Sequence, residues 1–346
     1  MAILGSLWVS PEIKAEQVEM SYPSLFTKGD KLILAPMQGL TSLFFRKAFQ
    51  ESFPDSMDYA VSPFISLTAG EIEKSRKKFK DVEPQQNDGS LTVVPQLLGN
   101  DADNMIKYID RLCDMGYKEV NLNLACPAKT AVRHGRGAAL LRDYRMVDKL
   151  LGKVVPVIGS SLSVKIRIGY DTKQELPALI DVLNSYPLNS VIVHPRLAVQ
   201  LYGGELDFEA FDLIEKRIRH RLIYNGEITS VEKFNQIKLR FPRVKDFMIG
   251  RGLLANPFLA AKIKNVNFSE GILKTFFFKL EKYYAEYAFG MQPSEEADVE
   301  KRNRYSQALT DKMKEFCKYL FPKNAALLSS CSTMEELNAN VSQMFR

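Results

Sequence analysis

Eight short apolar segments, each followed by a helical pattern, constrain the fold of this chain more than any other feature. Several of them, such as Val191-Ile-Val193, are nearly continuous β-branched runs. Such runs are typical of parallel strands that are buried on both faces of the sheet. The expected strands are Leu32–Ala35, Tyr59–Ser62, Thr92–Gln96, Glu119–Leu124, Ser163–Ile168, Ser190–His194, Leu222–Tyr224 and Asp246–Ile249.

Helical periodicity fills the stretches between these strands. Within residues 103–115, apolar side chains recur at the i, i+3, i+4 and i+7 positions, and Gly116 ends the pattern. The expected helices are Asp103–Met115, Tyr144–Val155, Leu176–Leu183, one capped by Thr41 or Ser42 that runs to Gln50, and one capped by Ser230 that runs through Ile237. Eight strands that alternate with helices over roughly 230 residues predict an α/β fold, a (β/α)8 TIM barrel. The competing doubly wound sheet lacks its fingerprint, because Gly135-Arg-Gly137 has no third glycine.

Beyond Pro257 the strand pattern stops and only helical patterns follow. They predict helices at Gly271–Ala288, Ala297–Leu320 and Thr333–Met344. An aromatic stripe at helical spacing, whose Phe residues we expect in a bundle core, consists of Phe276, Phe277, Leu280, Tyr283, Tyr284 and Tyr287. We therefore divide the chain into an irregular leader (1–30), a TIM-barrel domain (31–260) and a C-terminal all-helical domain (261–346).

The composition excludes several classes of protein. The chain has 346 residues, of which 46% are hydrophobic, and its net charge of +6 fits an anionic partner without demanding one. Its four cysteines form no CxxC pair, so we expect neither a disulfide framework nor a zinc site, and a reducing cytoplasm. Apolar runs long enough to span a membrane are missing, and residues 1–10 lack the basic start of a signal peptide.

Polar and glycine-rich clusters follow the expected strands, at the edge where TIM barrels carry their chemistry. They are Pro36-Met-Gln-Gly39, Gln96, Asn121 and Asn123 with Cys126, Lys165 and Arg167, His194 and Arg196, Asn225-Gly-Glu227, and Gly250-Arg-Gly252. The last two follow the seventh and eighth strands, where barrels often bind a phosphate, and Arg251 can pair with one. Ordinary loop glycine is the alternative for either turn alone.

Two side chains of this edge indicate the chemistry. Lys165 stands between Val164 and Ile166, and a lysine that points into a barrel mouth needs an anion or an electron-rich group. A flavin offers such a group, and a Schiff-base aldolase is the main alternative. Cys126 can be a nucleophile, a general acid or a small hydrophobe, and a thiol that is protonated at neutral pH can donate a proton.

These clusters, in this order, resemble the tRNA-dihydrouridine synthases from about Leu34 to Phe258. The resemblance depends on Ala35-Pro-Met37, Gln96-Leu-Leu-Gly99, Asn123-x-x-Cys-Pro127 with Lys129-Thr130, Val164-Lys-Ile-Arg167, Val193-His-x-Arg196, Asn225-Gly-Glu227 and Ile249-Gly-Arg-Gly252. The segment from Gly135 to Leu141 and the Cys-Pro-x-Lys-Thr motif look most like the bacterial DusC branch. One departure is Ala125, where the family usually has glycine, and the leader is another.

The resemblance implies an enzyme that reduces the C5–C6 bond of a uridine in the D arm of tRNA, with FMN as cofactor and NADPH as electron donor. It implies that Cys126 is the catalytic proton donor and that the helical domain binds tRNA, with a lean towards the uridine at position 16. The residues that would contact FMN are Pro36, Met37, Gln38, Gln96, Lys165, His194, Asn225, Gly226, Glu227, Gly250 and Arg251. The residues that would surround the uracil are Asn123, Arg167 and Tyr202. We further expect a cytoplasmic monomer with no metal site.

Three other functions stay open on the sequence alone. The first is an FMN-dependent barrel oxidoreductase that acts on a free pyrimidine or an enone. The second is an aldolase that uses Lys165. The third is a non-catalytic RNA-binding module, which the mild positive charge and the aromatic helical tail would allow.

Overall fold

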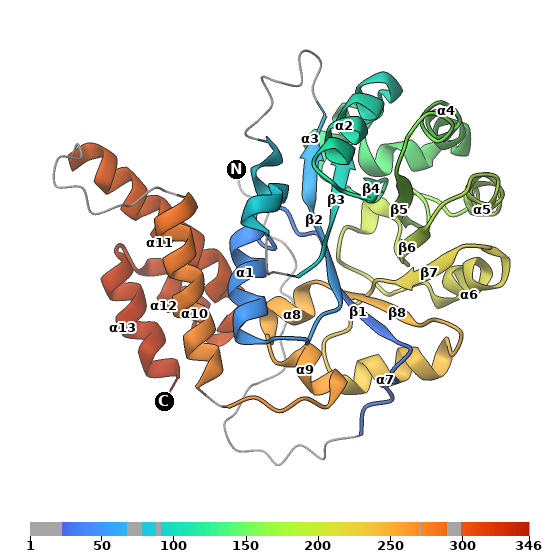
Figure 1. The fold of residues 1–346 in the computed structure, drawn as a ribbon. Coiled ribbons are helices and arrows are strands. Elements are labelled where there is room, and N and C mark those ends of the chain that lie inside the picture. Colours follow the sequence, from blue (N-terminus) through green and yellow to red (C-terminus); the bar gives the residue numbers. More distant parts are fainter. Residues whose placement is uncertain (1–22, 68–77, 88–90, 270, 289–298, 346) are drawn as a thin grey trace.

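The computed structural model describes residues 23–67, 78–87, 91–269, 271–288 and 299–345. Within these residues the strands close into a parallel barrel, because each strand pairs with its neighbour in the chain and β8 pairs with β1 (Figure 1). The predicted TIM barrel is therefore confirmed. Its strands are β1 (Lys31–Leu34), β2 (Tyr59–Ser66), β3 (Val93–Leu98), β4 (Glu119–Asn123), β5 (Ser161–Arg167), β6 (Ser190–His194), β7 (Arg221–Tyr224) and β8 (Asp246–Ile249).

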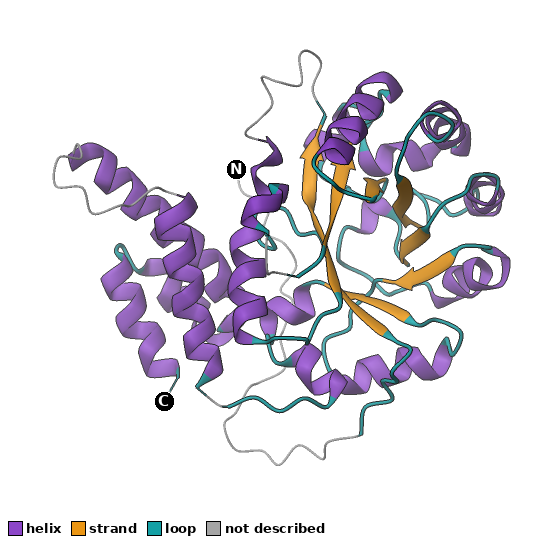
Figure 2. Cartoon of the chain, viewed as in Figure 1, coloured by secondary structure: helices purple, strands orange, loops and turns teal. Residues whose placement is uncertain are grey.

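Helices surround the barrel and form a separate group on one side of it (Figure 2). Those next to the strands are α1 (Leu43–Ser52), α2 (Ala102–Asp114), α3 (Lys129–Arg133), α4 (Tyr144–Val154), α5 (Leu176–Asn184), α6 (Phe208–Arg217), α7 (Val231–Arg240), α8 (Arg251–Ala255) and α9 (Leu259–Lys264). Those of the C-terminal group are α10 (Ile272–Tyr283), which continues as a π-helical turn, α11 (Val299–Leu320), α12 (Ala325–Ser330) and α13 (Met334–Met344). The sequence analysis missed α6, α8, α9 and the short helices α3 and α12.

Strand β2 runs past its predicted end at Ser62 although the next residue is Pro63. The pairing of β2 with β3 shifts its register between Val61 and Phe64. Proline cannot donate a hydrogen bond to a neighbouring strand, and strands tolerate it where the pairing is irregular. The strand therefore continues because the irregularity falls at the proline.

Apolar side chains alternate between the inside and the outside of the barrel. In β6, Ile192 belongs to a small inner cluster, whereas Val191 and Val193 belong to the large cluster that lies between the strands and the helices. This double burial explains the continuous apolar runs of the strands. The inner cluster consists of Ile33, Ala35, Val61, Val94, Ile192, Ile223 and Met248.

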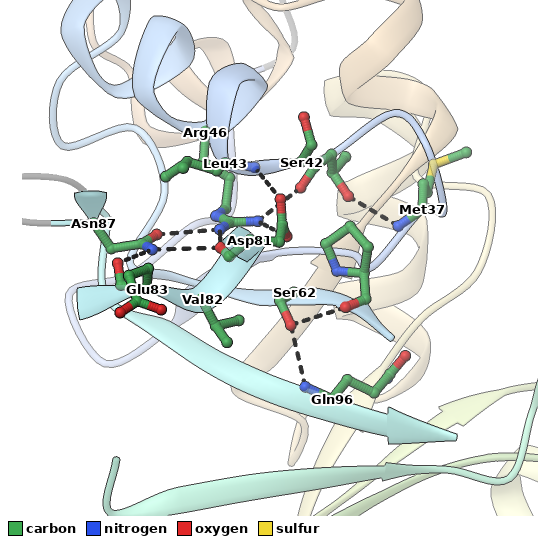
Figure 3. Close-up of polar contacts among 12 residues, drawn as sticks. Met37, Ser42, Leu43, Arg46, Ser62, Asp81, Val82, Glu83, Asn87 and Gln96 are labelled. Atoms are coloured by element: carbon green, nitrogen blue, oxygen red, sulfur yellow. Dashed lines mark hydrogen bonds and ion pairs between the residues drawn. The ribbon is translucent and has the colours of Figure 1, made fainter. Parts of the chain in front are cut away.

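Helix α1 begins directly after Ser42, as predicted, but the side chain of Ser42 does not cap it. The hydroxyl of Ser42 lies 2.6 Å from that of Tyr284 instead. The backbone N–H of Leu43 donates to a carboxylate oxygen of Asp81 at 2.6 Å (Figure 3). By contrast, Ser230 does cap α7, as predicted, by accepting a hydrogen bond from the backbone three residues on.

The C-terminal helices pack on α1, beside the barrel (Figure 1). The ring of Phe276 in α10 lies 5.6, 6.0 and 5.8 Å from the rings of Phe45, Phe49 and Phe53, measured between centroids. Phe45 also stacks on Phe316 of α11 at 5.9 Å. The Phe residues of the predicted stripe are buried, so their interpretation as core is confirmed.

Three predictions lie partly outside the described residues: positions 1–22 of the leader, 297–298 of the second long helix, and the side chain of Tyr287. Residues 23–30 of the leader form no helix or strand and pack on α7. There, the side chain of Asn235 accepts from the N–H of Leu25 at 2.8 Å and donates to the carbonyl of Pro23 at 3.0 Å. None of the helices that the structure describes is both long and apolar enough to cross a membrane.

Candidate active site

Polar side chains gather where the central strands end. Asn123 of β4 is in register with Lys165 of β5, and Arg167 of β5 is in register with His194 of β6. Residues in register on neighbouring strands point to the same side of a sheet, and Lys165 is also in register with the inner residue Ile192. These side chains therefore point into the barrel mouth, and all of them are buried.

A chain of hydrogen-bonded amides crosses β3, β4 and β5. Asn123 donates to Gln96 at 2.8 Å, Gln96 donates to Asn121 at 2.7 Å, and Asn121 donates to Ser163 at 3.0 Å. The backbone N–H of Gln96 in turn donates to the hydroxyl of Ser62 (Figure 3). Because each amide bonds to the next, the orientation of every one of them is fixed.

The turn that carries Cys126 is held by two buried side chains. The side-chain oxygen of Asn123 accepts from the backbone N–H groups of Ala125 and Cys126 at 3.0 and 2.9 Å. The guanidinium of Arg167 donates to the carbonyl of Ala125 at 3.0 Å. The position of the thiol is therefore set by residues of two strands.

A glycine makes this turn possible from the other side. Gly137 has a φ of +60°, and a β-carbon there would lie 2.7 Å from the carbonyl oxygen of Cys126. Ala125, the departure from the usual family pattern, does not have a positive φ. Its methyl group is therefore accommodated without backbone strain.

The environment of Cys126 keeps its thiol protonated. Burial raises the pKa of this thiol above its ordinary value, and this effect exceeds the opposite effects of the Ala128 backbone N–H and of the charges on Arg167 and Lys165. A protonated thiol suits a proton donor better than a nucleophile, which must be a thiolate.

Lys165 is a buried ammonium without a bonded partner. Its exposure is 9%, and its Nζ makes no hydrogen bond or ion pair with any residue that the structure describes. Burial and, to a smaller extent, the charge on Arg167 lower the pKa of Lys165 to about 7, and Cys126 opposes the change. Such a group is stabilised by an anionic or electron-rich neighbour.

His194 is held neutral. Burial lowers the pKa of its imidazole well below the usual value, and so do the nearby charges of Arg167, Lys165, Arg196 and Arg251. The Nε2 atom lies 3.4 Å from the guanidinium of Arg196, which can only donate, so we assign the ring proton to Nδ1. The imidazole can therefore donate a hydrogen bond from Nδ1.

Arginines and one tyrosine form the side of the mouth near β6 to β8. Arg196 is buried and donates to Glu227 at 2.6 Å, and the same carboxylate lies 3.6 Å from Arg251. Tyr202 is 51% exposed, and its ring lies 4.5 Å from the guanidinium of Arg251 and 5.6 Å from that of Arg167. An exposed ring beside two cations provides a surface on which a planar base can stack.

Comparison with known proteins agrees with this geometry. A sequence model described as dihydrouridine synthase (Dus) matches residues 33–346. The chain belongs to the dihydrouridine synthase family.

Two relatives align with the chain over similar shares of both lengths. The chain is 30% identical over 252 residues to a probable tRNA-dihydrouridine synthase of Rickettsia bellii, and the alignment covers 72% of this chain and 73% of that one. It is 28% identical over 243 residues to tRNA-dihydrouridine synthase B of Pseudomonas putida, which covers 69% of each chain. Morphinone reductase superposes with a TM-score of 0.48 at 14% identity, over 75% of this chain and 94% of that one. The DusC branch is not singled out, and stays a prediction.

Contacts connect several of the predicted site residues around one rim of the barrel. The turn of Pro36, Met37 and Gln38 reaches Gly250, because the sulfur of Met37 lies 3.2 Å from the place where a β-carbon of Gly250 would be. Asn225 donates to the carbonyl of Met248, within β8, at 2.9 Å. Some predicted side chains already have protein partners: the amide of Gln96 bonds at both ends, and the carboxylate of Glu227 pairs with Arg196 and Arg251.

Four residues contribute to the site although the sequence analysis gave them no role. Asn121 and Arg196 stand among the polar strand ends and complete the hydrogen-bonded networks. Lys312 and Tyr319 come from α11, and Tyr319 lies close enough to Tyr202 and Arg251 for their charges to affect its pKa. Lys312 and Tyr319 are seven residues apart, which places them on one face of the helix, and this spacing could have indicated from the sequence that they act together. The described residues contain no group of His, Cys, Asp and Glu that could hold a metal ion.

Proposed function

We propose that this synthase reduces the C5–C6 bond of a uridine in the D arm of tRNA, with FMN as cofactor and NADPH as electron donor. The observation that carries the proposal is that one barrel mouth holds a half-buried thiol, whose pKa burial raises, and a buried ammonium that has no partner among the described residues. Members of the family act on tRNA, as the names of the relatives state. The mouth supplies both a proton donor and a place for an electron-rich ring.

The residues at the mouth fit a flavin. Lys165 has no partner among the described residues and would pair with the electron-rich edge of the ring, and neutral His194 can donate a hydrogen bond from Nδ1. Arg251 and the turns after β7 and β8 would hold the phosphate end. When bound, FMN supplies the hydride that adds to C6 of the uracil. The proposed FMN contacts are Pro36, Met37, Gln38, Gln96, Lys165, His194, Asn225, Gly226, Glu227, Gly250 and Arg251.

Uracil would lie between the flavin site and the rim. The target base must leave the tRNA stack, because C5 and C6 are inaccessible within it. Asn123, Arg167 and Tyr202 would surround the extruded base, and Tyr202 offers it an exposed ring. Cys126 would donate its proton to C5, which balances the hydride at C6, and then recover a proton from solvent.

Mapping of dihydrouridine tests the proposed function directly. The protein is incubated with unmodified tRNA, FMN and NADPH, and the modified position is located by mass spectrometry. We expect dihydrouridine at one D-arm position, and the DusC-like motifs favour position 16. If the protein reduces a free pyrimidine or an enone but not tRNA, the result would instead support the alternative of an FMN-dependent barrel oxidoreductase that acts on small molecules.

One observation favours a second chemistry. A lysine with a pKa of about 7 beside another cation is also suited to form a Schiff base with a carbonyl substrate. Membership of the synthase family argues against an aldolase, and the two proposals differ in an easily measured property. A flavoprotein absorbs visible light, whereas an aldolase is colourless and is trapped on Lys165 by borohydride in the presence of its substrate.

Binding of tRNA should depend strongly on salt. We propose that the helical domain, residues 261–346, binds tRNA phosphates with lysines that include the exposed Lys318 and Lys323. Neutralising about three phosphates predicts a loss of affinity of about 20- to 40-fold between 50 and 200 mM salt. Filter binding over that range checks this result. An affinity that stays constant would contradict an electrostatic tRNA interface.

Binding of FMN should weaken as the pH rises above 7. The free protein holds Lys165 at a pKa of about 7, and a bound electron-rich ring raises that pKa because it favours the charged lysine. Between the two pKa values binding takes up a proton, so the affinity falls by up to about tenfold per pH unit from pH 7 to 9. Titration of apoprotein by quenching of flavin fluorescence measures the change. Lys165→Met is the control: it should bind FMN more weakly and lose this pH dependence.

A further inference from the structure

The turn after β1, which carries the proposed flavin-lining residues 36–38, is a tight β-turn. The N–H of Leu40 donates to the carbonyl of Met37 at 2.9 Å, and Gly39 has a φ of +79°. Glycine at the third position with this φ is typical of a type II turn. The buried hydroxyl of Thr41 accepts from the N–H of Met37 at 2.8 Å and closes the base of the turn. The tip, by contrast, is exposed.

A lysine of the C-terminal helices forms a hydrogen bond with this tip. The Nζ atom of Lys312 in α11 donates to the carbonyl of Gly39 at 3.0 Å. Its charge is balanced by Glu315 at 2.5 Å, and it lies 5.9 Å from the centre of the Tyr284 ring. The hydroxyl of Tyr284 in turn contacts Ser42, the residue that precedes α1. Both the tip and the end of the turn are therefore tied to the C-terminal helices.

The same helix also reaches the neighbouring turn, the one that follows β8. Tyr319 is two helical turns from Lys312, on the same face of α11. Burial and Tyr202 raise the pKa of Tyr319, and Arg251 opposes this change, so Tyr319 lies near the β8 turn. Helix α11 thus lies beside the rim at the two adjacent turns that follow β1 and β8.

We propose that Lys312 is a positioning residue for the flavin site, which holds the Gly39 carbonyl and thereby the conformation of residues 36–38. The proposal rests on the proposed function, because it places FMN against this turn. A hydrogen bond from a charged donor is stronger than a neutral one, and Lys312 is the described side chain that donates to the tip. Without it, the turn populates other conformations, and FMN binding must select the competent one.

A role of Lys312 in binding a tRNA phosphate is less consistent with its surroundings. Its side chain is only 19% exposed, and Glu315 already neutralises its charge. The two roles predict that replacing Lys312 weakens the binding of different ligands. A positioning lysine affects FMN affinity, whereas a phosphate-binding lysine affects tRNA affinity and its salt dependence.

The experiment compares Lys312→Met with a matched control in the same helix. Lys314 is 14% exposed and lies 3.7 Å from Asp311, so Lys314→Met removes a similar charge without touching the turn. Titration of the apoproteins should show that Lys312→Met weakens FMN binding about tenfold, which corresponds to about 1.4 kcal/mol. Lys314→Met should stay within about twofold of the wild type. Lys312→Arg should restore most of the affinity, because a guanidinium can also donate to the carbonyl.

Hydrogen exchange of the apoproteins provides a second readout that does not depend on FMN. The amides of Leu40 and Thr41, which bond within the turn, should exchange faster in Lys312→Met and not in Lys314→Met. If Lys312→Met does not fold, Tyr284→Phe replaces it; this variant loses the contact with Ser42 and should shift both measurements in the same direction.

The outcomes distinguish a failure of the proposed function from a failure of the positioning role of Lys312. A wild-type protein that binds no flavin would refute the proposed function, and the exchange data would still report whether Lys312 holds the turn. Wild-type FMN affinity and wild-type exchange in Lys312→Met would overturn the positioning role. A loss of tRNA affinity alone in that variant would assign Lys312 to the tRNA interface.

Discussion

Replacing Cys126 with alanine is expected to lower dihydrouridine formation on tRNA by a factor of about 10² to 10⁴. Burial keeps the thiol protonated, and the loss of this proton donor leaves the carbanion-like C5 without a placed acid. Reduction of the flavin by NADPH should continue at its usual rate, because this half of the reaction needs no proton from Cys126. The flavin spectrum under anaerobic conditions and the yield of dihydrouridine measure the two half-reactions separately.

A second cysteine provides the control for this variant. Cys113 lies in α2, is partly buried like Cys126, and has no part in the mouth. Cys113→Ala should therefore retain both half-reactions. Wild-type dihydrouridine formation by Cys126→Ala would show that another group, or water, delivers the proton.

Replacing Arg46 with methionine is expected to lower the free energy of unfolding by about 3 kcal/mol, the lower end of the range for breaking a buried ion pair. Arg46 is fully buried and donates to Asp81 at 3.0 Å, to the Asp81 carbonyl at 2.6 Å, and to Thr41 and Asn87 (Figure 3). Its loss removes these hydrogen bonds and leaves their acceptors with fewer donors. Asp81 also caps α1 through Leu43, so the start of this helix should weaken as well. Urea denaturation followed by circular dichroism measures the loss.

An exposed arginine gives the comparison. Arg243 is 64% exposed and lies 3.7 Å from Glu215, and exposed pairs contribute about 0–1 kcal/mol. Arg243→Met should therefore be nearly neutral. If Arg46→Met were equally mild, the network between α1 and residues 81–87 would be replaceable by apolar packing.

Local patterns were sufficient to predict most of the barrel. The β-branched runs marked the strands because both of their faces are buried, and Ser230 marked the start of α7 because a capping serine acts on its own helix. The cap of α1 could not be predicted in this way, since Asp81 supplies it from another segment. The end of β2 was predicted too early because Pro63 is tolerated only through the register shift.

The sequence was sufficient to predict which residues lie in the candidate site, but not which of them contact one another. Parallel strands bring their carboxyl ends to one edge, so the polar residues after each strand could be grouped from the sequence. Which amide bonds to which depends on strand register, as in the chain from Asn123 through Gln96 to Asn121. The contact of Lys312 with Gly39 depends on how the C-terminal helices dock, and no local pattern encodes that.

The docking of the last helices on the first has a consequence for synthesis on the ribosome. Phe45, Phe49 and Phe53 leave the ribosome early, whereas Phe276 and Phe316, which cover them, leave it late. At roughly 5–20 residues per second, this aromatic face stays uncovered on the nascent chain for on the order of ten seconds or more. During that interval a chaperone that binds exposed aromatic segments can protect the growing polypeptide from aggregation.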